Sequence, residues 1–505
     1  MRRLRDALTL KPERVLWLIA AYYLAAIVLR VLRTEGLQAD EAEQIVMSQY
    51  LLLGYGRQPP FYNWLQYGVI HLIGPSIFAL TLLKNSLLFL CCVLIGLATR
   101  QVSDRKEVAA AAMLGVLALP AVSVLSQRDL SHAIALLFCV SLFLYGILGA
   151  LKRPALWRYA LTGLAIGIGL ISKYNFIVVP IAAILAILSE AELRRRLFDR
   201  RLIATIVVAG LICLPHALWF LNNFDRATAD TIEEMRDDPT GHFIVDRLDG
   251  ITSLISATVD GVLPLIVFVT IAFGREVWAS RRTETLWTRM TGRMFLLCLV
   301  IVGLISFGMG ATTISQKWLS PFLLILPIYL FLKIEAAGGF ARRPQAVAIL
   351  ALPTSLLAFG FLLYLTAGNM LAPLHGRYQK DSFPAVPFVR QVLAEAGVNN
   401  RPDFIVANGM ALAAAARINA PDIPIAQPGI KHSAAFIARQ SRGLAIWNGA
   451  KTNALPAALD DFLRLNGIDT AALVAKTMVV PYPFSDGRDT EHFNYAWIAD
   501  PPDQD

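Results

Sequence analysis

The feature that most constrains this chain is a series of long apolar blocks. Most of them run for roughly 17–23 residues, enough for a helix to cross a hydrocarbon core about 30 Å thick. The blocks fall at residues 15–33, 76–99, 107–126, 130–150, 157–172, 175–189, 203–221, 251–273, 294–311, 318–333 and 345–366. Because 56% of the residues are hydrophobic and only 16% charged, a soluble protein is excluded. The sequence therefore predicts an all-α polytopic membrane protein with about eleven transmembrane helices.

Basic residues alternate between the loops and predict which side of the membrane each loop faces. Alternate loops carry Arg2, Arg3, Arg5, Lys11 and Arg14; Arg100, Arg105 and Lys106; Lys152 and Arg153; Arg194, Arg195, Arg196, Arg200 and Arg201; Arg275, Arg281, Arg282, Arg289 and Arg293; and Arg342 and Arg343. The positive-inside rule makes these loops cytoplasmic, together with the N-terminus. The opposite loops and everything after about residue 367 then face outward, which for a bacterial inner membrane is the periplasm.

Two parts of the chain follow from this topology. Residues 1–366 are predicted to form the transmembrane module, with a first outer loop at 34–75, and residues 367–505 a small periplasmic domain. The segment 403–407 followed by a helical pattern at 410–417 is typical of a β-α unit and makes this domain α/β. The boundary at 172–175 is open: it fits either a full loop between two spans or a re-entrant break.

Charge and cysteine content exclude several functions. The net charge of +9 lies mostly in short loops, where membrane topology explains it, and no basic face with interleaved aromatic residues indicates nucleic-acid binding. All five cysteines lie in apolar blocks, so no disulfide framework or cysteine metal site is predicted. No phosphate-binding P-loop and no dinucleotide fingerprint occurs.

The first outer loop gathers groups that could carry chemistry. Asp40 and Glu41 follow the first helix directly, and Tyr55, Arg57 and Gln58 precede a Pro-Pro pair. An aromatic belt and an aspartate that caps an interfacial helix would explain part of this pattern. A functional role gains weight because ionisable residues beside the bilayer are costly unless they are used.

Further polar residues interrupt the apolar blocks on the predicted outer face. Arg128 and Asp129 form a turn in which the two side chains could pair with each other, or in which the arginine could bind a phosphate. Lys173 with Asn175, and Lys317, oppose the positive-inside pattern. These lysines either extend toward lipid headgroups or neutralise a lipid-linked phosphate.

The acidic pair after the first helix, Pro59-Pro60, the Arg128-Asp129 turn and the Gly169–Asn175 stretch together resemble the GT-C glycosyltransferases. The resemblance covers roughly residues 10–335. The subgroup is the bacterial family-39 and family-83 type: protein mannosyltransferases, the transferase that adds aminoarabinose to lipid A, and the rhizobial galacturonosyltransferases.

The resemblance implies transfer of a sugar from a polyprenyl-phosphate-linked donor to an envelope acceptor, which could be lipopolysaccharide, another glycan or a protein. Asp40 matches the catalytic acid position and implies a general base, with Glu41 in support. The phosphate leaving group needs positive charge. The resemblance implies donor or phosphate binding by Tyr55, Arg57, Gln58, Arg128, Asp129, Lys173, Asn175 and Lys317.

One departure and two alternatives remain. The aminoarabinose transferases have Glu-Lys where this chain has Arg57-Gln58, which puts a divalent metal site in doubt, so no cofactor is certain. A transporter or flippase of lipid-linked sugars is the main alternative function, but the internal repeat typical of transporters is not found. A membrane scaffold without catalysis is disfavoured by the acids, bases and aromatic residues gathered on one face.

Overall fold

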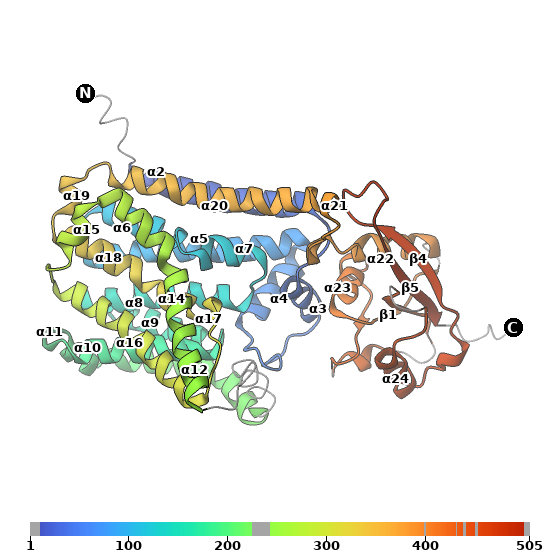
Figure 1. Ribbon diagram of the computed structural model, residues 1–505. Coiled ribbons are helices and arrows are strands. Elements are labelled where there is room, and N and C mark those ends of the chain that lie inside the picture. The colour runs from blue at the N-terminus through green and yellow to red at the C-terminus, as the bar shows by residue number, and fades with distance from the viewer. Residues whose placement is uncertain are drawn as a thin grey trace. The chain divides into compact units, whose positions relative to one another are not determined.

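The computed structural model describes residues 11–224, 243–397, 400–430, 432–437, 441–449 and 453–498. Most of the predicted outer loop at 222–250 therefore lies outside the described residues. The helices of the apolar part are α2 (Pro12–Arg33), α4 (Phe61–Ile73), α5 (Ile77–Val102), α6 (Lys106–Leu117), α7 (Ser126–Arg128), α8 (His132–Lys152), α9 (Leu156–Leu170), α10 (Val178–Leu188), α11 (Ala191–Arg194), α12 (Leu202–Leu221), α14 (Phe243–Phe273), α15 (Arg275–Ser280), α16 (Leu286–Met309), α17 (Gln316–Leu323), α18 (Ile325–Ala336), α19 (Gly339–Arg342) and α20 (Ala346–Met370) (Figure 1).

These helices confirm a polytopic, largely α-helical membrane protein. Within the described ranges, seven helices are long and apolar enough to cross a membrane, and the number rises to ten if each bent pair forms one span. The predicted block 157–172 corresponds to α9, which has only 15 residues. Since about 20 residues are needed to span the hydrocarbon core, α9 accounts for the difference from the expected eleven.

Bends divide several of the apolar blocks. The axis turns by 59° between Lys106–Leu117 and Ala121–Arg128, by 114° between Tyr174–Leu188 and Ala191–Phe198, and by 40° between α17 and α18. The first bend lies at Pro120 and continues into a π-helical turn, η1 (Ala121–Leu125). Proline and π-turns are the usual causes of such kinks because both interrupt the regular helical hydrogen bonds. As a result Arg128 ends a short helix of its own.

The chain divides into two compact units, and each is described by itself. The first comprises Met1–Ala25, Leu52–Tyr62 and Lys84–Phe361, and the second Ala26–Leu51, Asn63–Leu83 and Leu362–Asp505. The first unit is a bundle of apolar helices. The second contains α3 (Ala39–Met47) from the first outer loop together with the C-terminal residues. The functional division predicted at residue 366 stays a prediction.

A mixed five-stranded sheet organises the C-terminal residues. Its strands are β1 (Phe404–Ala407), β2 (Ile425–Ala426), β3 (Gly443–Asn448), β4 (Lys476–Pro481) and β5 (Thr490–Ile498), in the order β2-β1-β3-β5-β4. β1 pairs in parallel with β2 and β3, whereas β5 is antiparallel to β3 and β4. The helices are α21 (Ala372–His375), α22 (Ala385–Ala396), α23 (Met410–Asn419) and α24 (Ala457–Leu465). The predicted β-α unit is confirmed by β1 and α23.

The core of the second unit combines the first outer loop with the C-terminal sheet. Buried Ile45 and Val46 of α3 belong to the same apolar cluster as Phe388 of α22, Leu412 of α23 and Ile405 of β1. The other face of the sheet packs on Leu459 and Leu463 of α24. Because burial of a large apolar side chain contributes about 1.5–3 kcal/mol, this shared core holds α3 firmly on the C-terminal residues.

Candidate active site

Asp40 and Glu41 lie in the first turn of α3, where the sequence places both acids. The amide groups at a helix N-terminus carry a partial positive charge, which favours an ionised carboxylate. Asp40 is half-buried and Glu41 is fully buried, with 4% of its surface exposed. The two neighbouring carboxylates therefore have different surroundings and can have different tasks.

The Glu41 carboxylate is bound by an arginine of the preceding helix. Arg30 of α2 donates to this carboxylate from Nε at 3.2 Å and from Nη2 at 2.6 Å. The backbone N–H of Gln38 donates to the same carboxylate at 3.1 Å. Arg30 Nη2 also donates to the Gly36 carbonyl at 2.8 Å. This two-point arrangement fixes the planar guanidinium against the carboxylate. Glu41 thus connects the end of α2 to the first turn of α3.

A second buried ion pair reaches the C-terminal residues. Arg33 of α2 contacts Asp381 at 2.5 Å, and both side chains are almost completely buried. Asp381 belongs to the short 3-10 helix η4 (Lys380–Ser382). Gly36 lies against the same place: a Cβ atom at Gly36 would meet the Asp381 carbonyl oxygen at 2.4 Å. Only a residue without a side chain lets these two segments approach so closely.

The far end of α3 is attached to the edge of the sheet. The Gln49 side-chain amide accepts from the Ile425 N–H at 2.9 Å and donates to its carbonyl at 3.2 Å, so it continues the ladder beyond β2. Next to it, the Tyr50 ring stacks on Phe436 with centroids 5.6 Å apart. Burial raises the pKa of Tyr50 to about 12, so its phenol stays neutral. Both ends of α3 are therefore held in place.

The first unit contains the other predicted residues, beginning with a tight turn. Tyr55 and Gln58 pair through backbone hydrogen bonds of 3.1 and 3.3 Å, and Gly56 between them has φ +67°. This turn leaves the Arg57 side chain exposed at its tip, whereas the Tyr55 ring is buried and its hydroxyl accepts from the Leu52 amide. Arg57 is therefore presented to solvent by a rigid local structure.

Contacts connect this turn to the other predicted segments of the first unit. The Phe61 amide, directly after the Pro-Pro pair, donates to the Ile171 carbonyl at 3.0 Å. The Tyr62 and His132 rings lie 5.7 Å apart, which connects the turn to the segment after Arg128. Asn175 donates to the Trp318 carbonyl at 3.3 Å. Segments far apart in the sequence thus meet within one unit.

The predicted cations of the first unit differ in their exposure. Arg128 at the end of α7 and Lys317 in the first turn of α17 are exposed, and Lys173 is half-buried directly before the 3-10 helix η2 (Tyr174–Ile177). Asp129, also half-buried, follows α7. All three cations lie at helix ends: Arg128 follows a bend, whereas Lys173 and Lys317 precede the bends of their helix pairs.

Several polar residues were missed by the sequence reasoning. Arg30, Arg33 and Asp381 form the two buried pairs, and their signal was an arginine pair inside the last turn of an apolar helix. Lys84 and Asn85 are also buried in α5, where Asn85 accepts from Gln127 at 2.9 Å. Polar side chains inside an apolar block are the expected sign of use, and both positions met that criterion.

A hydrogen-bonded aromatic cluster was missed as well. His216 of α12 contacts the Leu53 carbonyl through Nδ1 at 2.7 Å and the Tyr174 hydroxyl through Nε2 at 3.3 Å. Trp219 stacks on His216 and lies against Gly54. The cluster fixes the backbone just before the Arg57 turn. The sequence signal was a histidine and a tryptophan on one face of an apolar helix.

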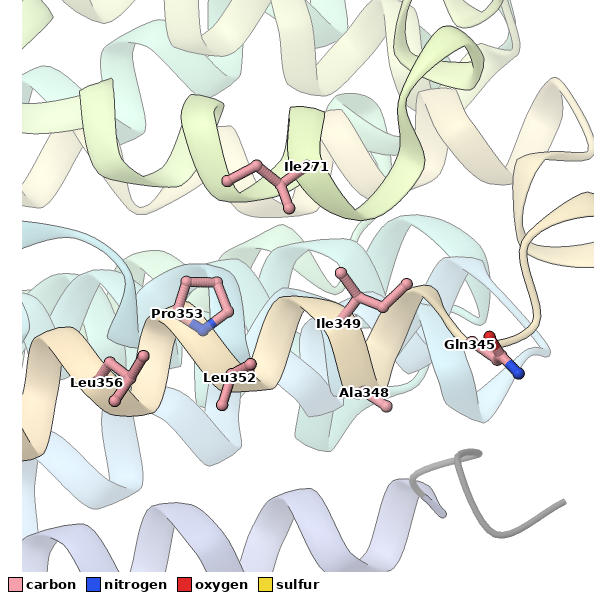
Figure 2. Close-up of a pocket in the computed structure, with 7 residues that line it drawn as sticks. All are labelled: Ile271, Gln345, Ala348, Ile349, Leu352, Pro353 and Leu356. Atoms are coloured by element: carbon pink, nitrogen blue, oxygen red, sulfur yellow. The ribbon is translucent and has the colours of Figure 1, made fainter. Parts of the chain in front are cut away.

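The first unit also contains an apolar groove. The groove, of about 440 Å³, lies between α14 and α20, and Figure 2 shows Ile271 facing Ile349 and Pro353 across it. It lacks titratable side chains and so offers no chemistry. Among the described residues, no three His, Cys, Asp or Glu side chains gather as metal ligands.

Comparisons with known proteins agree with this architecture. Residues 57–219 match the family model described as dolichyl-phosphate-mannose-protein mannosyltransferase. Over 97% of this chain and 99% of the other, the fold is similar to ArnT from Cupriavidus metallidurans bound to undecaprenyl phosphate, with a TM-score of 0.63. The two sequences are 15% identical, so this likeness concerns the fold alone.

Two curated relatives match over almost the whole chain. The lipopolysaccharide core galacturonosyltransferase RgtA of Rhizobium johnstonii is 39% identical, with 95% of this chain and 96% of the relative covered. RgtB of the same organism, which bears the same description, is 37% identical over 96% of this chain and 97% of the relative. This chain therefore belongs to the family of the rhizobial galacturonosyltransferases and is a membrane glycosyltransferase of GT-C type.

Proposed function

We propose that this enzyme transfers a glycuronosyl residue, galacturonate in its relatives, from a polyprenyl-phosphate donor to lipopolysaccharide. The acceptor and the sugar are those that the names of the two relatives give. The polyprenyl carrier is supported by the structural relative bound to undecaprenyl phosphate. The reaction would occur at the periplasmic side of the bacterial inner membrane, with the N-terminus in the cytoplasm, as the positive-inside pattern predicts.

The observation that carries the proposal is the position of Asp40 on a helix held at both ends. Asp40 accepts the proton of an acceptor hydroxyl, whose oxygen then forms a bond to the anomeric carbon of the sugar. The bond from that carbon to the phosphate oxygen breaks, and the polyprenyl phosphate leaves. A helix N-terminus keeps the Asp40 carboxylate ionised, as a general base requires.

Glu41 has a different task in this proposal. Its carboxylate is occupied by Arg30 and by the Gln38 amide, so it is a positioning residue for Asp40. The Gln49 contact with Ile425 does the same at the other end of α3. Correct placement of a base within a few tenths of an ångström is worth several kcal/mol of the barrier, which explains so much fixed structure around one short helix.

The donor phosphate would be bound by cations of the first unit. We assign this task to Arg57, Arg128, Lys173 and Lys317, whose positive charge stabilises the departing phosphate. Tyr55, Gln58, Asp129 and Asn175 would support them: the Tyr55–Gln58 pair shapes the turn that presents Arg57, and Asn175 connects to α17 beside Lys317. These assignments rest on residue chemistry and local geometry.

The test is transfer by the solubilised enzyme, with Asp40→Asn as the variant. Because proton transfer to a positioned base contributes about 10²–10⁴-fold, we expect a loss of at least about 100-fold. Glu35→Gln is the matched control: Glu35 belongs to the same loop but forms an exposed ion pair with Arg390. The measurement is mass spectrometry of lipopolysaccharide core incubated with a polyprenyl-phosphate-linked galacturonate.

The outcomes distinguish the proposed function from its alternatives. Full activity of Asp40→Asn contradicts the catalytic assignment, and an equal loss in Glu35→Gln means that the loop as a whole was disturbed. Activity in detergent, without a bilayer that separates two compartments, excludes the transporter alternative. Modification of lipid A or a protein in place of the core would revise the acceptor and leave the reaction unchanged.

A further inference from the structure

The first unit contains a second cavity that the proposed reaction does not use. It has a volume of about 490 Å³ and is lined by the end of α8, by α11 and the following 3-10 helix η3 (Arg195–Phe198), and by the beginning of α16. The charged lining consists of Lys152, Glu192, Arg195 and Arg196, and Trp287 supplies an aromatic wall. The positive-inside pattern predicts that these loops face the cytoplasm.

Specific contacts hold the walls of this cavity. Glu190, which is 7% exposed, accepts from Arg289 of α16 at 3.0 and 2.9 Å and contacts Arg293 at 2.9 Å. These pairs attach the corner between α10 and α11 to α16. From the other side, the Tyr159 hydroxyl of α9 donates to the Arg196 carbonyl at 3.1 Å. Ion pairs and hydrogen bonds therefore hold together the segments that line the cavity.

The net positive charge of the side chains that line the cavity favours an anionic ligand. Three cations face one carboxylate, Glu192, so the cavity has an excess of two positive charges. In the described part of the chain, Lys152, Arg195 and Arg196 form no ion pair. Lys152 Nζ lies 5.7 Å from the centre of the Trp287 ring, which leaves this lysine beside an amphipathic aromatic surface. Arginine side chains of this kind bind phosphate oxygens with two parallel hydrogen bonds.

The surroundings of the cavity favour a lipid headgroup over a soluble anion as its ligand. The helical axis turns by 114° between Tyr174–Leu188 and Ala191–Phe198, so the basic segment runs across the end of its span. On the same segment Phe198 is 78% exposed, and Trp157 at the start of α9 is 54% exposed. Exposed aromatic side chains beside cations are typical of the membrane interface. Basic pockets between transmembrane helices on this side bind anionic lipid headgroups.

We propose that this cavity binds the phosphate of an anionic phospholipid headgroup, with Arg195, Arg196 and Lys152 as ligands and Trp287 beside the glycerol. Topology alone explains basic residues in a cytoplasmic loop, but it requires no cavity and no aromatic wall. The two explanations differ in what they predict for other arginines of the same membrane face. If these arginines serve only membrane topology, replacing any pair of them should affect lipid binding equally. If the cavity is a binding site, only the arginines that line it should affect lipid binding.

The experiment is native mass spectrometry of the delipidated enzyme titrated with phosphatidylglycerol or with phosphatidylcholine of the same acyl chains. We expect the wild type to prefer phosphatidylglycerol. The double variant Arg195→Gln/Arg196→Gln should lose on the order of 30-fold in affinity, since each basic side chain near a membrane surface contributes about 1 kcal/mol. The matched control is Arg281→Gln/Arg282→Gln, two adjacent exposed arginines of the same predicted face outside the cavity.

The remaining variants keep the result interpretable. Arg195→Lys/Arg196→Lys retains the charge and should keep most of the preference, and it replaces the glutamine variant if that protein fails to fold. Equal losses in the cavity variant and the control overturn the proposal, as does the absence of any preference in the wild type. If glycerol 1-phosphate displaces the lipid when both are at the same concentration, the cavity binds soluble phosphates. That result would overturn the proposal that a lipid is its ligand.

Discussion

At the scale of single residues, Gly36 is the position where the structure leaves least freedom. It lies between α2 and α3, and an added Cβ would meet backbone atoms of Asp381 at 2.4 and 2.7 Å and the Phe383 carbonyl at 2.8 Å. Backbone atoms cannot rotate away as a flexible side chain can. A methyl group here must therefore displace η4, and with it the Asp381 carboxylate that pairs with Arg33.

Gly36→Ala is accordingly predicted to destabilise the protein and to reduce transfer. The cost of inserting a methyl group into a tightly packed place is about 1–3 kcal/mol. The measurement is the apparent melting temperature of the purified enzyme in detergent, together with the transfer rate. We expect a lower melting temperature and a lower rate, because the start of α3 moves with its anchors.

The matched control is Gly68→Ala, in the same compact unit. Gly68 lies within α4, and nothing is found within 4 Å of its added Cβ. Alanine is favoured over glycine inside a helix by up to about 1 kcal/mol, so this variant should be at least as stable as the wild type. If both variants melt at the wild-type temperature, the close approach of Gly36 to Asp381 does not matter for stability.

At the scale of secondary-structure elements, the corner between α10 and α11 depends on one carboxylate. The hydrogen bonds from Arg289 lower the pKa of Glu190 from its usual value and outweigh burial, which would raise it. A carboxyl whose pKa is lower in the folded state stabilises the fold above its unfolded pKa. That contribution is lost as the pH falls through the folded pKa. The ion pair should therefore weaken only in acid, below about pH 4.5.

Glu190→Gln is predicted to remove this contribution to the pH dependence of folding stability. At pH 7 the variant should melt at a slightly lower temperature than the wild type, because its partners are 33% and 43% exposed and solvent screens the pair. Between pH 7 and pH 3.5 it should lose less melting temperature than the wild type. Glu192→Gln, an exposed neighbour, is the control. An equal acid-induced loss in wild type and Glu190→Gln would contradict this account.

The elements also show how far the sequence could predict the structure. Length and hydropathy were enough to find the helices, because burial in lipid leaves helical segments little choice of conformation. The polar interruption at Lys173 marked a true break between α9 and η2. The bounds of α9 were predicted to within two residues, but its 15 residues fall short of a full membrane span.

The candidate site was predictable only in part. Asp40 and Glu41 stood out because two acids follow an apolar helix. The pair of Arg33 with Asp381 did not, since 348 positions separate the two residues and only the packing of the second unit brings them together. Gln49 had no signal either: its hydrogen bonds to Ile425 depend on where α3 meets the edge of the sheet. Local pattern shows which groups are available, and tertiary packing decides which of them meet.

At the scale of the whole molecule, the sequence order does not follow the compact units. The second unit joins α3 and part of the first outer loop to residues from Leu362 onward. Its core includes Leu37, Ile45, Val46 and Leu80 from the N-terminal part of the chain. The C-terminal residues are therefore one wall of the structure that carries Asp40, and they are unlike an appended domain that could be exchanged freely.

This arrangement predicts that residues 367–505 do not fold when they are produced alone. Without α3 the fragment exposes the face of α23 on which α3 packs, and α23 is a largely apolar helix whose Leu412 is buried in the whole chain. Asp381 would also lose Arg33, and breaking one buried ion pair by removing a partner costs about 3–5 kcal/mol. That loss is comparable to the 5–15 kcal/mol by which a whole domain is stable.

The measurement is thermal unfolding of the secreted fragment, followed by near-ultraviolet circular dichroism. We expect no cooperative transition, and we expect a transition to return when residues 33–51 are fused ahead of residue 367 through a flexible linker. In the fusion, Asp381→Asn should lower the melting temperature, because it removes the carboxylate that Arg33 binds. A fragment that melts cooperatively without α3 would mean that the sheet forms its own core, and that the first outer loop only attaches to a finished domain.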